Sequence, residues 1–133
     1  MEKLEKRFVK ASWKGPTSTL KRCLDLGIDP DFRDRSRTAL GWSALYGNVE
    51  RIRLLIDAGA DVNHCENGGT TPLILAASNG HLDAVKLLVD AGADTTAKDD
   101  RGMTAYAATL HMMRCNDDYC YNDVLAFLSN YPS

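Results

Sequence analysis

One histidine and two cysteines near the C-terminal end of the chain could bind a metal ion or form a redox pair. His111, Cys115 and Cys120 fall within ten residues, with Asp117 and Asp118 between them. Thiolate and imidazole are common zinc ligands, but zinc sites usually show a Cys-x-x-Cys pair or a second matched pair, and neither occurs here. The spacing therefore favours a solvated loop with free thiols over a metal- or redox-responsive site.

Three arginines alternate with other residues in the segment Arg33-Asp34-Arg35-Ser36-Arg37. If the segment is extended, this alternation would point the three guanidinium groups to one side. The planar guanidinium fork suits carboxylates on a protein as well as phosphates. A solvated turn, in which Asp31 and Asp34 offset the positive charge, explains the same pattern about equally well.

No motif in the chain indicates an enzyme, and no cofactor is expected. There is no glycine-rich phosphate loop, no His-Glu-x-x-His and no Gly-x-Ser-x-Gly, and the three histidines are scattered.

The 16 Lys and Arg against 18 Asp and Glu give a net charge of -2, so no overall field attracts nucleic acid or an anionic membrane. No apolar run approaches membrane-spanning length, and the charged N-terminal residues do not resemble a signal peptide. We expect a cytoplasmic protein that could also enter the nucleus, with its four cysteines reduced.

The chain repeats itself with a period of 33 residues. Thr38, Thr71 and Thr104 keep this interval, and so do Gly59 and Gly92. An earlier copy is found by stepping back 32 residues, because one residue is missing between the first two units. Four units fill the chain as a single domain, 1–133, with approximate bounds 1–32, 33–65, 66–98 and 99–133.

Each unit is predicted to form two short helices followed by a polar turn. In the third unit Thr71 is a good N-cap, and Pro72 loses no hydrogen bond at the first helical position. Gly80 ends the first helix, and Gly92 provides the left-handed residue that closes the second. Helices of about ten residues are marginal alone in water, so they persist only by stacking on neighbouring units. The predicted fold class is all-α, a solenoid of four stacked helix-turn-helix units with hairpin loops.

The third unit closely resembles the consensus unit of the ankyrin repeat family, through Thr71-Pro72-Leu73 and Gly92-Ala93-Asp94. The second unit follows the same pattern one period earlier, and the resemblance covers the whole chain. It implies an L-shaped unit in which inner helices and hairpin fingers line a concave face, and a function in protein recognition. It also implies that Asn63 orders the hairpin by bonding backbone groups.

The chain departs from that family pattern at two places. The histidine that often follows Thr-Pro-Leu in the family is replaced by Gly41, Ile74 and Ala107, so its side-chain bonds must be made otherwise or lost. Residues Cys115 to Asn122 are interpreted as an insertion of about six or seven residues, placed where solenoids tolerate loops. The final helix is then expected near Asp123–Ser129.

The family geometry points the two residues before the glycine of each inner helix into the concave groove. Trp13 and Tyr46 come from adjacent units and are expected side by side, with Leu45 between or beneath them. The stack demands no buried role for these aromatic residues, and aromatics are enriched in binding hot spots, although Trp13 could simply cover the first unit. Trp42 lies on the face that usually packs, which favours a core position for it. The four groove pairs are Trp13-Lys14, Leu45-Tyr46, Ser78-Asn79 and His111-Met112.

These patterns predict a monomeric, non-catalytic module that binds another protein on its concave face. Arg35 and Arg37 are expected to rim an apolar patch, which suits a partner with an aliphatic or aromatic anchor and nearby acids. One alternative is a stoichiometric regulator or inhibitor of an enzyme or a cytoskeletal factor that acts through the same face. The other is the metal- or redox-responsive protein using Cys115 and Cys120. The candidate partner contacts are Trp13, Arg35, Arg37, Trp42, Leu45, Tyr46, Asn79, Arg101 and Met112.

Overall fold

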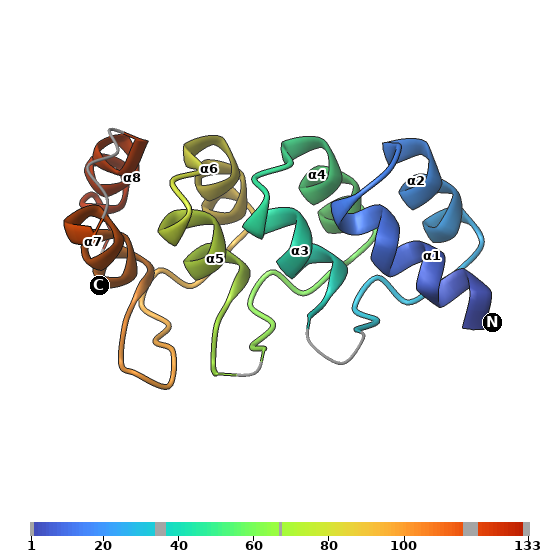
Figure 1. Ribbon diagram of the computed structural model, residues 1–133, viewed down its shortest axis with the longest axis horizontal. Coiled ribbons are helices and arrows are strands. Elements are labelled where there is room, and N and C mark those ends of the chain that lie inside the picture. The colour runs from blue at the N-terminus through green and yellow to red at the C-terminus, as the bar shows by residue number, and fades with distance from the viewer. Residues whose placement is uncertain (1, 34–36, 67, 116–119, 132–133) are drawn as a thin grey trace.

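The computed structural model describes residues 2–33, 37–66, 68–115 and 120–131. Within these residues the chain forms eight helices and no strand, with one isolated antiparallel bridge between Arg33 and Thr38. The all-α prediction is therefore confirmed, and each predicted unit holds one pair of helices (Figure 1). The helices are α1 (Glu2–Trp13), α2 (Thr17–Asp25), α3 (Ala39–Leu45), α4 (Val49–Asp57), α5 (Pro72–Ser78), α6 (Leu82–Asp90), α7 (Ala105–Cys115) and α8 (Cys120–Leu128).

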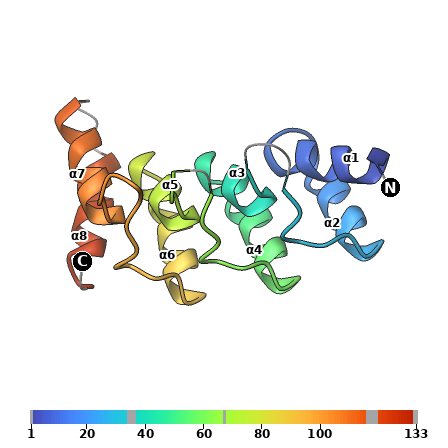
Figure 2. The same ribbon diagram turned by 90° about the horizontal axis from the view of Figure 1, so that it is seen from below.

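The helices lie in two rows. An inner row contains α1, α3, α5 and α7, and an outer row contains α2, α4, α6 and α8 (Figure 2). Each helix packs against the other helix of its pair and against the next helix of its row. The loops after α2, α4 and α6 extend beyond the helices on one side (Figure 1), and we call them the first, second and third fingers, residues 26–38, 58–71 and 91–104.

Threonine caps begin the inner helices at the predicted positions. The Thr38 and Thr71 hydroxyls accept hydrogen bonds from backbone N–H groups three residues on, at 3.1 and 3.2 Å. Thr104 does the same for Ala107 at 3.2 Å. Such bonds satisfy N–H groups that have no partner within the first turn of a helix. The 33-residue spacing of these threonines therefore sets the spacing of the inner helices.

The core repeats with the sequence. Phe8, Leu40 and Leu73 of the inner row are each at most 1% exposed. In the outer row the corresponding buried residues include Leu20, Ile52, Val85 and Val124. Large apolar side chains from successive units therefore meet and form one continuous core, as stacking requires.

The last unit contains six extra residues, and the described residues on either side of them differ from the insertion expected from Cys115 to Asn122. Val85 and Val124 are 39 residues apart instead of 33, which gives the size of the insertion. The predicted bounds were wrong, because α7 continues through Cys115 and α8 already begins at Cys120. Part of the insertion thus lengthens α7 to 11 residues, against seven in α3 and α5.

Asn63 joins the second finger to the third. Its side-chain oxygen accepts a hydrogen bond from the backbone N–H of Asp94 at 2.7 Å, and its amide donates to the Gly92 carbonyl at 3.2 Å. Asp31 accepts in the same way from the N–H of Asp61 at 2.8 Å. The backbone-ordering role expected for Asn63 is confirmed, and these bonds hold successive fingers in register.

Gly59 and Gly92 close the outer helices with φ of 94° and 96°, as the sequence predicts. A Cβ at Gly59 would meet no atom within 4 Å, so any cost of a side chain there comes from backbone strain alone. We expect Gly59→Val to lower the free energy of unfolding by about 1–3 kcal/mol in urea denaturation. The adjacent Ala58, exposed with φ of -83°, provides the control: Ala58→Val should cost no more than about 0.7 kcal/mol. Equal costs at the two positions would contradict the strain argument.

Candidate protein-binding site

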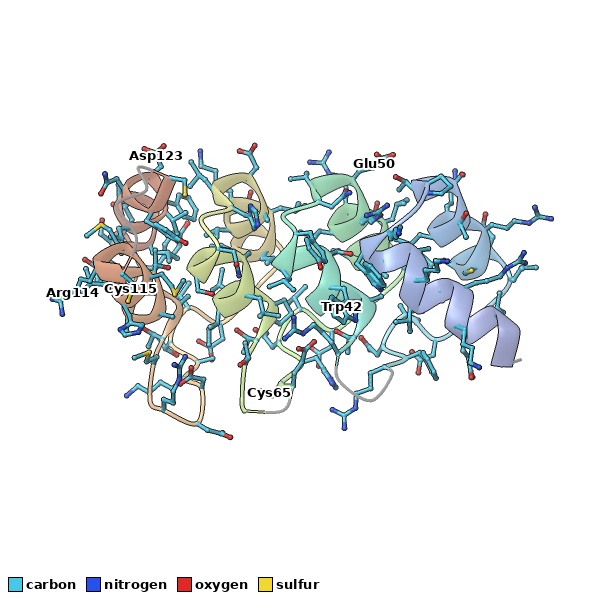
Figure 3. All side chains as sticks on the ribbon, viewed as in Figure 1. Trp42, Glu50, Cys65, Arg114, Cys115 and Asp123 are labelled. Atoms are coloured by element: carbon cyan, nitrogen blue, oxygen red, sulfur yellow. The ribbon has the colours of Figure 1, made fainter. Side chains whose placement is uncertain are left out.

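Three aromatic rings from α1 and α3 form a ladder: Trp13, Trp42 and Tyr46. The Trp42 ring lies in the middle, with its centroid 5.8 Å from that of Trp13 and 6.3 Å from that of Tyr46. The Trp42 and Tyr46 planes are nearly parallel, at 10°, whereas Trp13 is tilted by 37°. Both spacings lie in the range of favourable aromatic pairs. Figure 3 labels Trp42 on α3, beside α1.

Trp13 and Tyr46, the two outer rings of this aromatic ladder, are exposed to solvent. Trp13 is 40% exposed and Tyr46 54% exposed, and among the described residues only Leu26 is another large apolar side chain classed as exposed. Trp42 is half-buried, and its ring nitrogen is buried without a hydrogen-bond acceptor among the described residues. The core position favoured for Trp42 was therefore wrong. Its indole lies between the rings of Trp13 and Tyr46 instead.

Leu45 is not one of the exposed residues of this surface. It is half-buried and packs against the core, and its carbonyl lies 2.9 Å from the His81 ring nitrogen Nε2. His81 precedes α6, so this contact ties the second unit to the third. Leu45 therefore belongs to the packing between units, and its expected place between or beneath the aromatic rings stays a prediction.

The guanidinium group of Arg37 lies over the Trp42 ring. Its guanidinium carbon is 5.0 Å from the centre of the Trp42 ring, within the range of cation–π attraction. Its Nε donates to the Glu66 carboxylate at 2.9 Å, an ion pair in which the Glu66 side chain is only 3% exposed. Arg37 was expected on an exposed rim of the patch. It is half-buried instead, because Glu66 and Trp42 hold it from two sides.

Gly41 makes room for the Glu66 carboxylate. A Cβ built on Gly41 would lie 1.9 Å from Glu66 Oε1, so any side chain there would displace it. The same oxygen accepts from the backbone N–H of Thr38 at 3.1 Å and from its hydroxyl at 3.4 Å. Gly41 stands where the family often has a histidine. In this turn a carboxylate from the next finger accepts the bonds from Thr38.

Glu66 has a raised pKa. Burial is the main cause, because it disfavours the charged form, while the hydrogen bonds from Thr38 and the nearby Arg37 charge act in the opposite direction and only partly compensate. A carboxylate this deeply buried is tolerated only when it is paired and hydrogen-bonded. Glu66 was not among the residues singled out from the sequence. The sequence did contain a signal for this contact, since glycine replaces the usual histidine at position 41 and position 66 is an acid.

The remaining sequence candidates lie apart from the aromatic ladder, and Arg35 lies outside the described residues. Asn79 is exposed on α5 but folds back on its own helix, donating to the Leu75 carbonyl at 2.7 Å. Met112 is half-buried on α7. The structure thus brings Trp13, Trp42, Tyr46 and Arg37 together and leaves the candidates of the third and fourth units separate.

Arg101 lies in the third finger and pairs with Asp99 at 3.2 Å. Burial alone would raise the pKa of Asp99, but the N–H groups of Met103 and Arg101 and the Arg101 guanidinium outweigh it, and the pKa is lowered. Asp99 bonds within its own finger, whereas Glu66, one period earlier, reaches back to the preceding unit. Arg101 therefore stabilises its own turn, and its side chain remains 67% exposed.

The thiols of the last unit form no metal site among the described residues. Cys115 Sγ lies 4.0 Å from His111 Nε2, but no group of three or more possible ligands is placed to hold an ion within the described ranges. Cys115 and Cys120 are not joined by a disulfide. Asp117 and Asp118 lie outside the described residues. Within the described part of the chain, no helix is long and apolar enough to cross a membrane.

Comparison with known proteins identifies the family. Residues 8–99 match the family described as ankyrin repeats (3 copies), so the chain belongs to the ankyrin repeat family. Ankyrin repeats generally act as protein–protein interaction modules.

Three relatives contain similar segments within longer proteins. The putative ankyrin repeat protein YahD of Escherichia coli (strain K12) is 33% identical over 73 residues, 54% of this chain and 36% of that protein. ARF GTPase-activating protein Git of Drosophila melanogaster is 40% identical over 63 residues, 46% of this chain and 9% of that protein. E3 ubiquitin-protein ligase KEG of Arabidopsis thaliana is 37% identical over 101 residues, 72% of this chain and 6% of that protein. The matched segments thus cover 36% or less of these relatives.

The Gly41–Glu66 contact can be tested with a double-mutant cycle. We expect Gly41→Ala to destabilise the protein, because its methyl group needs the space of the Glu66 carboxylate. Glu66→Ala should cost about 2–4 kcal/mol, since it leaves Arg37 without its charge partner and Thr38 without its acceptor. In the Glu66→Ala background, however, Gly41→Ala should cost clearly less, because only the Arg37 stem, whose Cγ lies 2.7 Å from the built Cβ, must still move, and alanine favours a helix over glycine by about 1 kcal/mol. Additive effects in urea denaturation would contradict the steric coupling.

The raised pKa of Glu66 gives a pH dependence of defined sign. The folded protein holds the Glu66 proton more tightly than the unfolded chain, whose glutamates titrate near 4.5. Between the two pKa values stability therefore falls as pH rises and increases as pH falls. Relative to Glu66→Gln, which cannot titrate, the wild type should gain stability as pH is lowered from neutral towards 4.5. Denaturation curves of both proteins over that range measure the difference, and an opposite slope would refute the assignment.

Proposed function

We propose that this protein binds a partner protein through the aromatic ladder of Trp13, Trp42 and Tyr46 and carries out no catalysis of its own. The observation that carries the proposal is the exposure of the two outer rings, 40% and 54%, on either side of a half-buried third ring. Aromatic side chains bury a large area at low entropic cost, and they dominate binding hot spots. The ladder offers a rigid apolar surface of this kind.

Trp42 supports a binding role because its ring is not the best choice for stability. One unit further on, the equivalent position holds Leu75, which is 7% exposed and belongs to the core. An indole N–H buried without an acceptor costs about 1–3 kcal/mol. Trp42 instead stacks on Tyr46 and fixes the separation of the exposed rings. A side chain with this cost is better explained by a surface that a partner recognises.

The charges around the aromatic ladder indicate which kind of partner it would bind. The helices α3, α5 and α7 contain no aspartate or glutamate, and Lys10 and Lys14 are exposed on and just after α1. Nearby Arg37 is already neutralised by Glu66. The fitting partner is therefore a segment with an aliphatic or aromatic anchor and acidic residues beside it. A regulator or inhibitor of another protein would use this same surface, and its mode of action would then be competition for the anchor.

The proposal predicts that Trp13→Ala with Tyr46→Ala abolishes partner capture from a native lysate of the source organism. Once a captured partner is purified, each single truncation should weaken binding by about 2 kcal/mol or more in calorimetry. Stability should change much less, by about 1 kcal/mol, because both rings are exposed.

Tyr131→Ala is the matched control, since Tyr131 is an aromatic contact at the opposite end of the chain. Trp13 and Trp42 are the only two tryptophans, so binding should also change the tryptophan emission. The proposal fails if the double variant captures the same proteins as the wild type.

A further inference from the structure

The first unit contains an open cleft between α1 and α2, separate from the aromatic ladder. Its volume is about 790 Å³. Leu4, Arg7 and Ala11 line it from α1 at helical spacing, and Arg22 and Leu26 line it from the other wall. Residues of α1 that meet the second unit, Ser12 and Trp13, are not part of its lining. In later units the neighbouring pair of helices packs against this face, but in the first unit it is open.

All charged residues that line this cleft are cations. They are Arg7, Lys10, Lys14 and Arg22, all exposed, in a chain whose net charge is -2. The shallower hollow between α4 and α6 is different, because Arg53 and Lys86 there alternate with Asp83 and Asp90. If this surface served only to keep the first unit soluble, charges of both signs would serve equally well. Four cations without a lining acid therefore indicate a ligand with negative charge.

The floor and one wall of the cleft are apolar. Cys23 and Ala11 lie at the bottom and are 3% and 2% exposed, while Leu26 is 64% exposed at the edge. Arg7 and Arg22 line the cleft together with Cys23. Burial raises the pKa of the Cys23 thiol, and the charges of these two arginines partly oppose this. An exposed leucine at the edge of a cationic cleft offers a contact that an inorganic anion cannot use.

We propose that this cleft binds an acidic segment of a partner protein in which apolar side chains alternate with carboxylates. The carboxylates would pair with Arg7 and Arg22, since guanidinium groups bind carboxylates with two parallel hydrogen bonds. An apolar side chain between them would cover Leu26 and the floor of the cleft. This is a second recognition surface that does not depend on the aromatic ladder.

The experiment uses the full chain and a short fluorescent peptide of alternating glutamate and leucine, followed by fluorescence polarisation. We expect saturable binding that weakens with added salt and that Arg22→Glu reduces by about tenfold. Lys21→Glu is the matched control, because Lys21 is exposed on the same helix but does not line the cleft, and it should change binding by less than about twofold. Leu26→Ser should remove the preference for this peptide over a glutamate-only peptide of equal length.

Four outcomes would overturn the proposal. These are no saturable binding, equal losses in Arg22→Glu and Lys21→Glu, displacement of the peptide by millimolar inorganic phosphate, or tighter binding to vesicles containing phosphatidylserine. Loss of peptide binding in the Trp13→Ala, Tyr46→Ala variant would also refute it, since it would move the site to the aromatic ladder. Unfolding curves check each variant, and Arg22→Gln replaces Arg22→Glu if the latter does not fold.

Discussion

Each helix in this protein buries its apolar side against the other helix of its pair and against the units before and after it. The helices have seven to twelve residues, too few to be stable alone in water. Small residues at the contacts let the units approach closely: the Ser43 hydroxyl donates to the Ser12 carbonyl at 3.0 Å, and a Cβ on Gly47 would lie 2.4 Å from the His81 ring. Because every unit is covered by its neighbours, open surface for a ligand remains along the inner row, at the fingers and at the ends of the stack.

Gly41 stands where the family often has a histidine, and the Glu66 carboxylate fills the space beside it. Here the carboxylate comes from the next finger, so it joins two units and holds Arg37 over the Trp42 ring. The buried charge is costly to desolvate, but its two hydrogen bonds to Thr38 and its ion pair offset much of that cost. Breaking the pair would thus disturb the second finger and the aromatic ladder together, although Glu66 touches none of the three rings through a bond of its own.

The fold followed from the sequence because its determinants are local and repeated. Threonine caps, closing glycines and the 33-residue period each act within one unit, and Asn63 bonds to the adjacent finger as its position suggested. The site was harder to predict because it depends on contacts between units. The exposure of Trp13 and Tyr46 was foreseen, but the indole of Trp42 was expected in the core, and only its packing between the two rings shows otherwise. Arg37 was assigned to a rim because its partner, Glu66, lies 29 residues further along the chain.

Charge is distributed unevenly between the two rows of helices, although the total is nearly balanced. Glu50 and Asp123 lie on outer helices, on the side of the molecule away from the fingers (Figure 3), while α3, α5 and α7 contain no carboxylate at all. The positive side chains concentrate on the first unit, around Arg7, Lys10 and Arg22. An approaching acidic partner would therefore be attracted mainly to the first unit, which also contains the exposed Trp13 ring. Over distances longer than the Debye length of about 8–10 Å this steering disappears, so it acts mainly on the rate of the final approach, while the aromatic contacts determine how long the complex lasts.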